Sequence, residues 1–168
     1  MVLPSIEIAS LYEDKAGPEV IQQMYTFQDR GGRALALRPE GTATLQELAR
    51  TTLKFRKDIR LWYETRCWRY ERPQAGRYRE FSQFGVEVLN PSYDWLPTLL
   101  DLAVAMVQAV TDQYIVNESV RRGLAYYTGP GFEIVCPALG AQQQVCGGGR
   151  YAEGAGFALG VDRLLLVS

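Results

Sequence analysis

The sequence predicts an α+β fold, in which an antiparallel sheet has helices packed on one face. Stretches with the pattern of β-strands follow one another with few helices between them, which argues against a doubly wound sheet. Residues 60–89 have the pattern of two strands joined by a short basic loop, and residues 94–114 have the best helical pattern. With 168 residues, the chain has the size of one domain. We expect the open face of the sheet to hold the functional site.

The two strands of residues 59–89 present faces of different character, because side chains alternate along a strand. One face of the first strand carries Ile59, Leu61, Tyr63, Thr65, Cys67, Arg69 and Glu71. The apolar face of the second strand carries Phe84, Val86 and Val88. Its opposite face carries Phe81, Gln83, Gly85 and Glu87. This mixture is not typical of a core, and a glycine lets a ligand approach the backbone. The mixed face is predicted to line a cleft, and the alternative is a solvent-exposed surface.

Residues 72–79 form the basic loop between these strands. Pro73 and Gly76 interrupt regular structure and leave Arg72, Arg77 and Arg79 on a short connection. The guanidinium group binds phosphate or carboxylate through paired hydrogen bonds. The pattern therefore predicts an arginine lid over an anionic ligand, and the simpler alternative is a solvated basic face.

Composition excludes several classes of protein. The net charge is −1, so no overall field attracts nucleic acid. The chain has three cysteines without a CxxC pair and no histidine, so we predict neither a metal site nor disulfides and expect a reducing, cytoplasmic location. The start of the chain has no basic region typical of a signal peptide. The longest apolar run, near residues 99–110, contains Asp101 and Gln108, which excludes a membrane span.

The first third of the chain predicts short elements. Residues 1–10 have the pattern of an edge strand or the start of a short helix, and residues 24–38 that of a hairpin with its turn at residues 29–32. A helix is expected to begin near Thr42 or Thr44, where Thr44 and Glu47 fit a capping box. Glu40, just before this helix, is an alternative capping acid.

The last third predicts a core helix and two glycine-rich segments. In the helix of residues 94–114, the expected apolar positions are Trp95, Leu99, Leu102, Met106 and Val110. Residues 121–135 predict a hairpin with a Gly-Pro turn. Residues 146–168 predict a glycine-rich strand and a short helix from Val161, and their glycines lack the strand–helix–strand context of a dinucleotide-binding loop.

Three blocks of the chain resemble the motifs of class II aminoacyl-tRNA synthetases, in the form found in histidyl-tRNA synthetases. The run from Arg69 to Gln83, with Glu71-Arg72-Pro73-Gln74 and Gly76-Arg77-Tyr78-Arg79 in it, resembles motif 2. Residues 121–129 resemble the histidine-specific motif RGLDYYTG, with Ala125 where the family has aspartate. Residues 146–163 resemble motif 3, with Asp162 where glutamate is commoner. Asn117 also replaces an upstream aspartate.

This resemblance implies a class II synthetase-like antiparallel sheet flanked by helices and covering residues 1–168. Residues 1–10, with Pro4 and Glu7, resemble the end of motif 1. The full motif 1 helix, the insertion domain and the anticodon-binding domain of those enzymes are expected to be absent.

The resemblance also implies roles for single residues. Arg69 would bind the α-phosphate of ATP, and Arg122 the α-phosphate and the reacting carboxylate, as the catalytic pair. Glu71, Phe81, Arg77 and Arg163 would complete the ATP site, the first two near adenine and the arginines on the β- and γ-phosphates. The amino-acid site would consist of Glu40, Thr42, Gln83, Glu87, Tyr126 and Tyr127. In this site Glu87 would face the imidazole ring, unless it pairs with an arginine such as Arg122.

The implied activity is formation of histidyl adenylate from histidine and ATP, with Mg²⁺ carried by the triphosphate. The partners implied are the acceptor end of tRNA and a second copy of the chain. An alternative is a non-catalytic paralogue that senses histidine or regulates a partner. Such paralogues tend to lose the ATP-binding arginines, so the presence of these arginines in this chain favours the enzyme.

Overall fold

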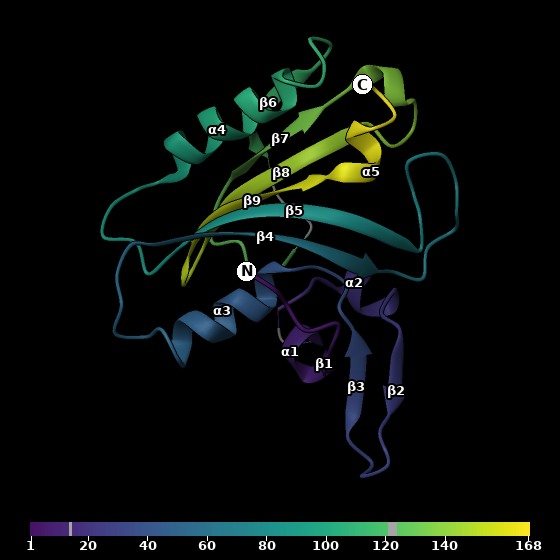
Figure 1. Ribbon diagram of the computed structural model, residues 1–168, viewed down its shortest axis with the longest axis vertical. Helices are drawn as coiled ribbons and strands as arrows, with labels where there is room; N and C mark the ends of the chain where they lie inside the picture. Colours follow the sequence, from purple (N-terminus) through teal and green to yellow (C-terminus); the bar gives the residue numbers. More distant parts are fainter. Residues whose placement is uncertain (14, 121–123) are drawn as a thin grey trace.

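The computed structural model describes residues 1–13, 15–120 and 124–168. Within them, the chain forms two antiparallel sheets (Figure 1). The smaller sheet has the order β1-β3-β2, from strands Ile6–Ile8, Ala34–Leu37 and Thr26–Gln28. The larger has the order β4-β5-β9-β8-β7-β6. Its strands are, in chain order, Ile59–Trp68, Glu80–Leu89, Ile115–Val120, Gly131–Val135, Gln144–Tyr151 and Gly154–Gly160. The α+β class and the antiparallel arrangement are confirmed.

Helices lie on both faces of the larger sheet, where one face was expected (Figure 1). Helix α4, Leu96–Gln108, packs on β8 and β9. Helix α3, Thr42–Arg50, packs against the other face near β5. The short helical elements are α1, α2, α5 and a 3₁₀ turn, at Ser10–Glu13, Pro18–Gln22, Val161–Leu164 and Pro137–Leu139. None of the described helices is long and apolar enough to cross a membrane.

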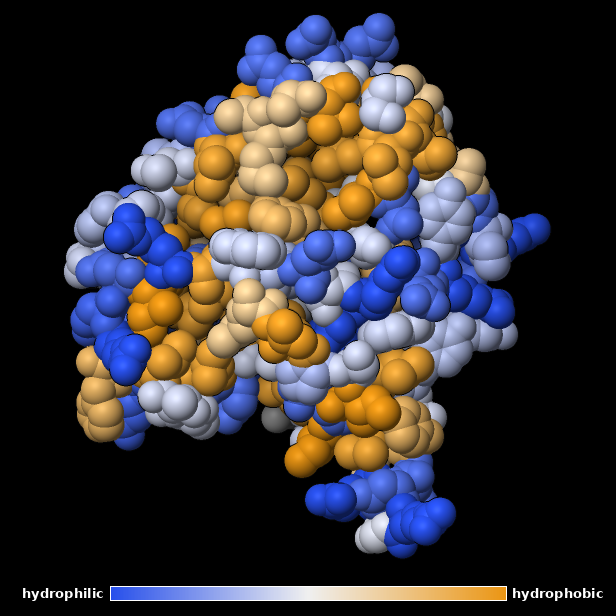
Figure 2. Space-filling model, in the orientation of Figure 1, coloured by the Kyte–Doolittle hydropathy of each residue, from blue (hydrophilic) through white to orange (hydrophobic). Residues whose placement is uncertain are grey.

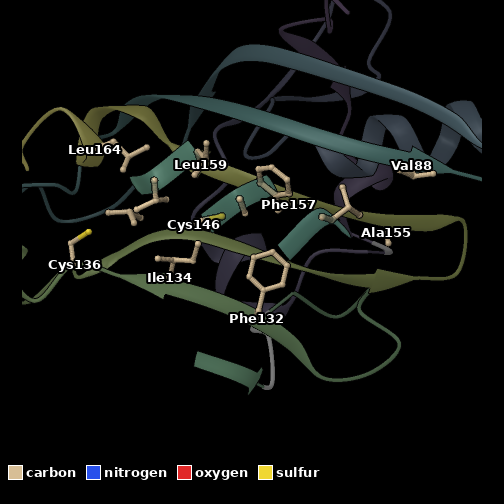
Figure 3. Close-up of a cluster of buried hydrophobic side chains, with 13 residues drawn as sticks. Val88, Phe132, Ile134, Cys136, Cys146, Ala155, Phe157, Leu159 and Leu164 are labelled. Atoms are coloured by element: carbon tan, nitrogen blue, oxygen red, sulfur yellow. The ribbon is translucent and has the colours of Figure 1, made fainter. Parts of the chain in front are cut away.

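The main core lies between α4 and the face of the larger sheet that carries Phe132, Ile134, Phe157 and Leu159 (Figure 3). The residues of α4 buried in it are Leu99, Ala103 and Val107. Two predicted core positions are instead exposed: Leu102 of α4 by 43%, and Val110, which lies beyond the end of α4, by 38%. Leu102 was wrongly predicted because α4 is apolar on most of its circumference, so periodicity alone does not select the face that meets the sheet. Val110 was wrongly predicted because α4 covers only residues 96–108 of the expected 94–114.

Glu40, and not Thr44, caps α3. The backbone N–H groups of Thr42 and Ala43 donate to the two carboxylate oxygens of Glu40 at 2.7 and 2.8 Å. The hydroxyl of Thr44 donates to Glu7, and Glu47 pairs with Arg50. The capping box was wrong because the helix begins at Thr42, which places Thr44 inside its first turn.

Several other expectations for local structure are confirmed, whereas the hairpin predicted for residues 121–135 includes residues 121–123, which lie outside the described residues, and only Gly131–Val135 of it forms a strand. Strand β1 lies at an edge of the smaller sheet, β2 and β3 form the predicted hairpin, and Gly32 in its turn has φ of 78°. Strands β4 and β5 pair along their full length, with Tyr63 opposite Gly85. Strand β4 ends at Trp68, so Arg69 and Glu71 belong to the connection and not to the strand itself.

Candidate functional site

A cavity of about 320 Å³ lies on the face of the larger sheet opposite α4. Its floor includes Gly147, Ala158 and Gly160, which occupy neighbouring positions on β8 and β9. Because these side chains are small or absent, a flat ligand has direct access to the strand backbone. The walls come from the connection between β4 and β5, the start of α3, and the segment before β7.

The cavity collects ten of the twelve residues assigned to the site from the sequence. They are Glu40, Thr42, Arg69, Glu71, Arg77, Phe81, Gln83, Tyr126, Tyr127 and Arg163. Arg122 lies outside the described residues. Glu87 does not line the cavity but lies beneath it, 1% exposed. Residues separated by more than 120 positions in the chain are therefore brought to one place by the sheet.

One end of the cavity is basic. The guanidinium of Arg69 lies 5.3 Å from the centroid of the Phe81 ring and donates from Nε to the carbonyl of Pro39 at 2.9 Å. Arg77 forms an ion pair with Glu71, so Glu71 lies at this basic end in the structure. Arg69 and Phe81 thus pair a cation with an aromatic face, an arrangement suited to a phosphate beside a planar base.

Arg163 completes the basic end. It donates to the carbonyls of Gly76 at 2.6 Å and Gln144 at 2.7 Å, and to the amide oxygen of Gln142 at 3.1 Å. The preceding residue of α5 is also held in place, because Asp162 accepts the backbone N–H of Ser82 at 2.6 Å. Burial lowers the pKa of Arg163, which Glu71 opposes and Arg69 and Arg77 reinforce. Arg69, Arg77 and Arg163 therefore place three positive charges close together, and a bound anion would reduce the repulsion between them.

The other end of the cavity contains carboxyl groups. Glu40 is 3% exposed, and in addition to its two backbone donors it accepts the hydroxyl of Tyr126 at 3.3 Å. Burial raises the pKa of Glu40, while the hydrogen bonds from Ala43 and Thr42 act against this. Buried Arg38 anchors the segment that leads to Glu40, since its guanidinium donates to the carbonyls of Pro4 and Arg66.

Glu87 is linked to this end through hydroxyl groups. Its two carboxylate oxygens accept hydrogen bonds from Thr42 Oγ1 and from the Tyr151 hydroxyl, both at 2.8 Å. Burial raises the pKa of Glu87 to about 8. An added Cβ on Gly156 would lie 1.6 Å from Glu87 Oε2, so the glycine provides the space for this carboxyl group. Thr42 therefore stands between Glu87 and the cavity.

Several site residues were not found from the sequence. Tyr151 holds Glu87, and Gln142 and Gln144 contact Arg163. Tyr151 is the last residue of the glycine-rich strand β8. The two glutamines belong to a polar run at the start of this strand. These two features were the available signals in the sequence. No cluster of three or more potential metal ligands occurs among the described residues.

Residues 1–111 match the family described as histidyl-tRNA synthetase. The chain belongs to this family. It is 28% identical to the histidine–tRNA ligase of Archaeoglobus fulgidus over 268 aligned positions, which cover 96% of the chain and 66% of that ligase. The chain spans slightly less than two thirds of such relatives. Because the alignment is longer than the chain, these relatives contain internal segments without a counterpart here.

Two solved structures extend the relationship to the fold. The apo histidyl-tRNA synthetase of S. aureus superposes with a TM-score of 0.75 and 26% identity, covering 99% of this chain and 59% of that one. A protein from Bacillus halodurans described as an ATP phosphoribosyltransferase regulatory subunit/histidyl-tRNA synthetase has a TM-score of 0.78 and 16% identity, covering 99% and 73%. At that identity, the second likeness shows the fold alone. The class II synthetase fold is thereby confirmed.

Proposed function

We propose that this domain is ligase-like and forms histidyl adenylate from histidine and ATP. One observation carries the proposal: Arg69, Arg77 and Arg163 surround one end of a cavity whose other end holds Glu40 and Thr42. Adenylate formation brings a carboxylate to the α-phosphate, so the site must supply positive charge and fixed positions. The two ends match the two substrates in charge, with cations for the triphosphate and a carboxyl group for the α-ammonium group.

In this proposal ATP lies on the floor of Gly147, Ala158 and Gly160. Adenine stacks on Phe81, and Arg69 and Arg122 contact the α-phosphate at which the carboxylate attacks. Arg77 and Arg163 bind the β- and γ-phosphates, and Mg²⁺ enters with the triphosphate. The ion pair between Arg77 and Glu71 then has to open or rearrange, which frees Glu71 to approach the adenine amino group.

The amino acid occupies the other end. Glu40 and Thr42 bind the α-ammonium group, and Gln83, Tyr126 and Tyr127 surround the side chain. Glu87 selects the imidazole ring, which donates an N–H group to a carboxylate in either protonation state. Because Thr42 Oγ1 bonds to Glu87, a ring that contacts Glu87 directly has to displace this hydroxyl.

Pyrophosphate exchange into ATP with each amino acid in turn tests the proposal. We expect exchange that depends on ATP, Mg²⁺ and histidine. If ATP binds but no amino acid supports exchange, the alternative of a non-catalytic paralogue that senses histidine or regulates a partner replaces it. Ala125, which stands where the resembling family has aspartate, is the specific feature that favours this alternative.

For tRNA, we propose that the loop after β4 meets the acceptor end. Arg72 and Arg79 are exposed, and the Arg79 guanidinium lies 4.3 Å from the ring centroid of the exposed Tyr70. Such a patch binds phosphates without reading sequence, so we expect salt-sensitive binding with little preference among tRNAs. A filter-binding assay that finds strong preference for one tRNA at physiological salt would contradict this expectation.

We also propose a homodimer that uses the smaller sheet. Ile6, Ile8 and Phe27 of this sheet are 48%, 55% and 41% exposed. Figure 2 shows hydrophobic side chains gathered over this part of the molecule, above the hydrophilic tip of the β2–β3 hairpin. An exposed edge strand with apolar side chains is suited to pairing with a second copy. Sedimentation should show a dimer at tens of micromolar, and only monomer there would exclude it.

A further inference from the structure

Arg163 is held in the cavity entirely by neutral groups. Its three acceptors are the carbonyls of Gly76 and Gln144 and the side-chain amide oxygen of Gln142. In the part of the chain that the structure describes, no carboxylate forms an ion pair with this arginine. Other arginines among the described residues are paired with acids, including Arg77 with Glu71, Arg50 with Glu47 and Arg150 with Asp94.

The contrast matters because Arg163 is partly buried. A carboxylate at hydrogen-bond distance would fix the guanidinium firmly but would also cancel its charge. An amide oxygen accepts the same hydrogen bond without adding charge. Arg163 is thus oriented in the empty cavity while its positive charge stays available to an anionic ligand.

Gln142 is the only side chain among the three acceptors of Arg163, and it also meets the basic loop. A Cβ added to Gly76 would lie 3.6 Å from both Gln142 Cβ and Arg163 Cγ. Gln142 itself lines the cavity and is half-buried. The connection before β8, the basic loop and α5 therefore meet at this glutamine.

We infer that Gln142 is a positioning residue for the terminal phosphates of the nucleotide. Its neutral amide oxygen orients Arg163 and leaves the positive charge of Arg163 available to those phosphates. This inference rests on the proposed function, because it requires that a nucleoside triphosphate binds at the basic end. It predicts that the neutrality of the side chain at position 142 matters as much as its hydrogen bond.

The test is calorimetric titration of wild type, Gln142→Glu and Gln142→Ala with Mg²⁺-ATP and with AMP. In Gln142→Glu the new carboxylate pairs with Arg163, so we expect ATP affinity to fall about tenfold or more. Gln142→Ala loses only the orienting hydrogen bond, so the fall should be smaller. AMP lacks the β- and γ-phosphates, and its affinity should be the same in all three proteins.

The matched control is Gln143→Glu, which adds the same charge one position along, at an exposed side chain. It should bind ATP within about twofold of wild type, since exposed charges are screened. Thermal melts complete the test: Gln142→Glu should melt at or above the wild-type temperature while binding ATP more weakly.

A merely structural role gives a different outcome, because a glutamate that holds Arg163 as well or better would leave ATP affinity unchanged. Equal ATP affinity in Gln142→Glu and Gln143→Glu, or an equal loss of ATP and AMP affinity in Gln142→Glu, overturns the inference but leaves the proposed function intact. A wild-type chain that binds no ATP overturns both.

Discussion

At one end of the cavity, Arg163 is held by two carbonyls and an amide; at the other, Glu87 is held by two hydroxyl groups. Both are charged residue types with neutral partners, but the results differ. The arginine lines the cavity and stays a cation, whereas the carboxyl lies beneath the cavity with a pKa raised to about 8. An arginine keeps its proton under almost any burial, while a carboxylate without a cation beside it becomes neutral instead.

The basic end therefore carries its charge before any ligand binds, whereas the carboxyl groups of the acidic end become charged when a cation enters beside them. At the acidic end, Glu40 receives two backbone N–H groups, but burial still raises its pKa. An ammonium group that enters beside Glu40 favours the ionised form of this carboxyl group.

The largest effect should come from removing a cation at the basic end. Arg69→Ala removes the guanidinium beside Phe81, and we expect pyrophosphate exchange to fall about 100- to 1,000-fold, as for other groups that stabilise transition-state charge. Arg66→Ala is the control, because Arg66 is exposed on the opposite face of β4. Similar rates for both variants would remove Arg69 from the catalytic role.

The pH dependence of stability should report on the acidic end. The folded protein keeps the Glu87 proton up to about pH 8, whereas the unfolded chain releases it near 4.5. Between these values the folded state binds more protons, so the free energy of unfolding should fall as pH rises, by an amount on the order of a few kcal/mol.

Glu87→Gln removes this titration and should flatten the dependence on pH. Denaturant unfolding at several pH values between 5 and 8 measures it. Glu40, whose pKa is also raised, is present in both proteins and therefore cancels in the difference. Exposed Glu64→Gln should keep the wild-type slope. Parallel curves for wild type and Glu87→Gln would show that Glu87 is ionised in the fold.

The third effect concerns the substrate. Glu87→Gln should weaken histidine binding about tenfold, because an imidazole that enters beside Glu87 favours its ionised form, whereas an amide cannot ionise to hold the ring N–H. Its ATP affinity should be unchanged, since the basic end is intact. Calorimetric titration with both ligands measures the two ends separately. Unchanged histidine affinity in this variant would exclude Glu87 from amino-acid selection.

Much of the fold followed from local pattern. Alternation along β4 and β5 predicted which face of β5 carries Gln83, Gly85 and Glu87. The ten assigned residues that line one cavity were identified through the resemblance to the synthetase motifs. These features depend on the period of a strand and on single residues such as glycine, so the order of the amino acids is sufficient to reveal them.

Other features were decided only by contacts between distant parts of the chain. Thr42 and Glu87 are 45 positions apart, Glu87 and Tyr151 are 64 apart, and Gln142 reaches Arg163 over 21. The buried face of α4 and the burial of Glu87 likewise depend on what packs against them. By itself the sequence determined most of the chemical groups that face the cleft, with Glu87 as an exception. The tertiary structure decided which of them stay charged, because charge depends on burial and on the partners that burial brings within reach.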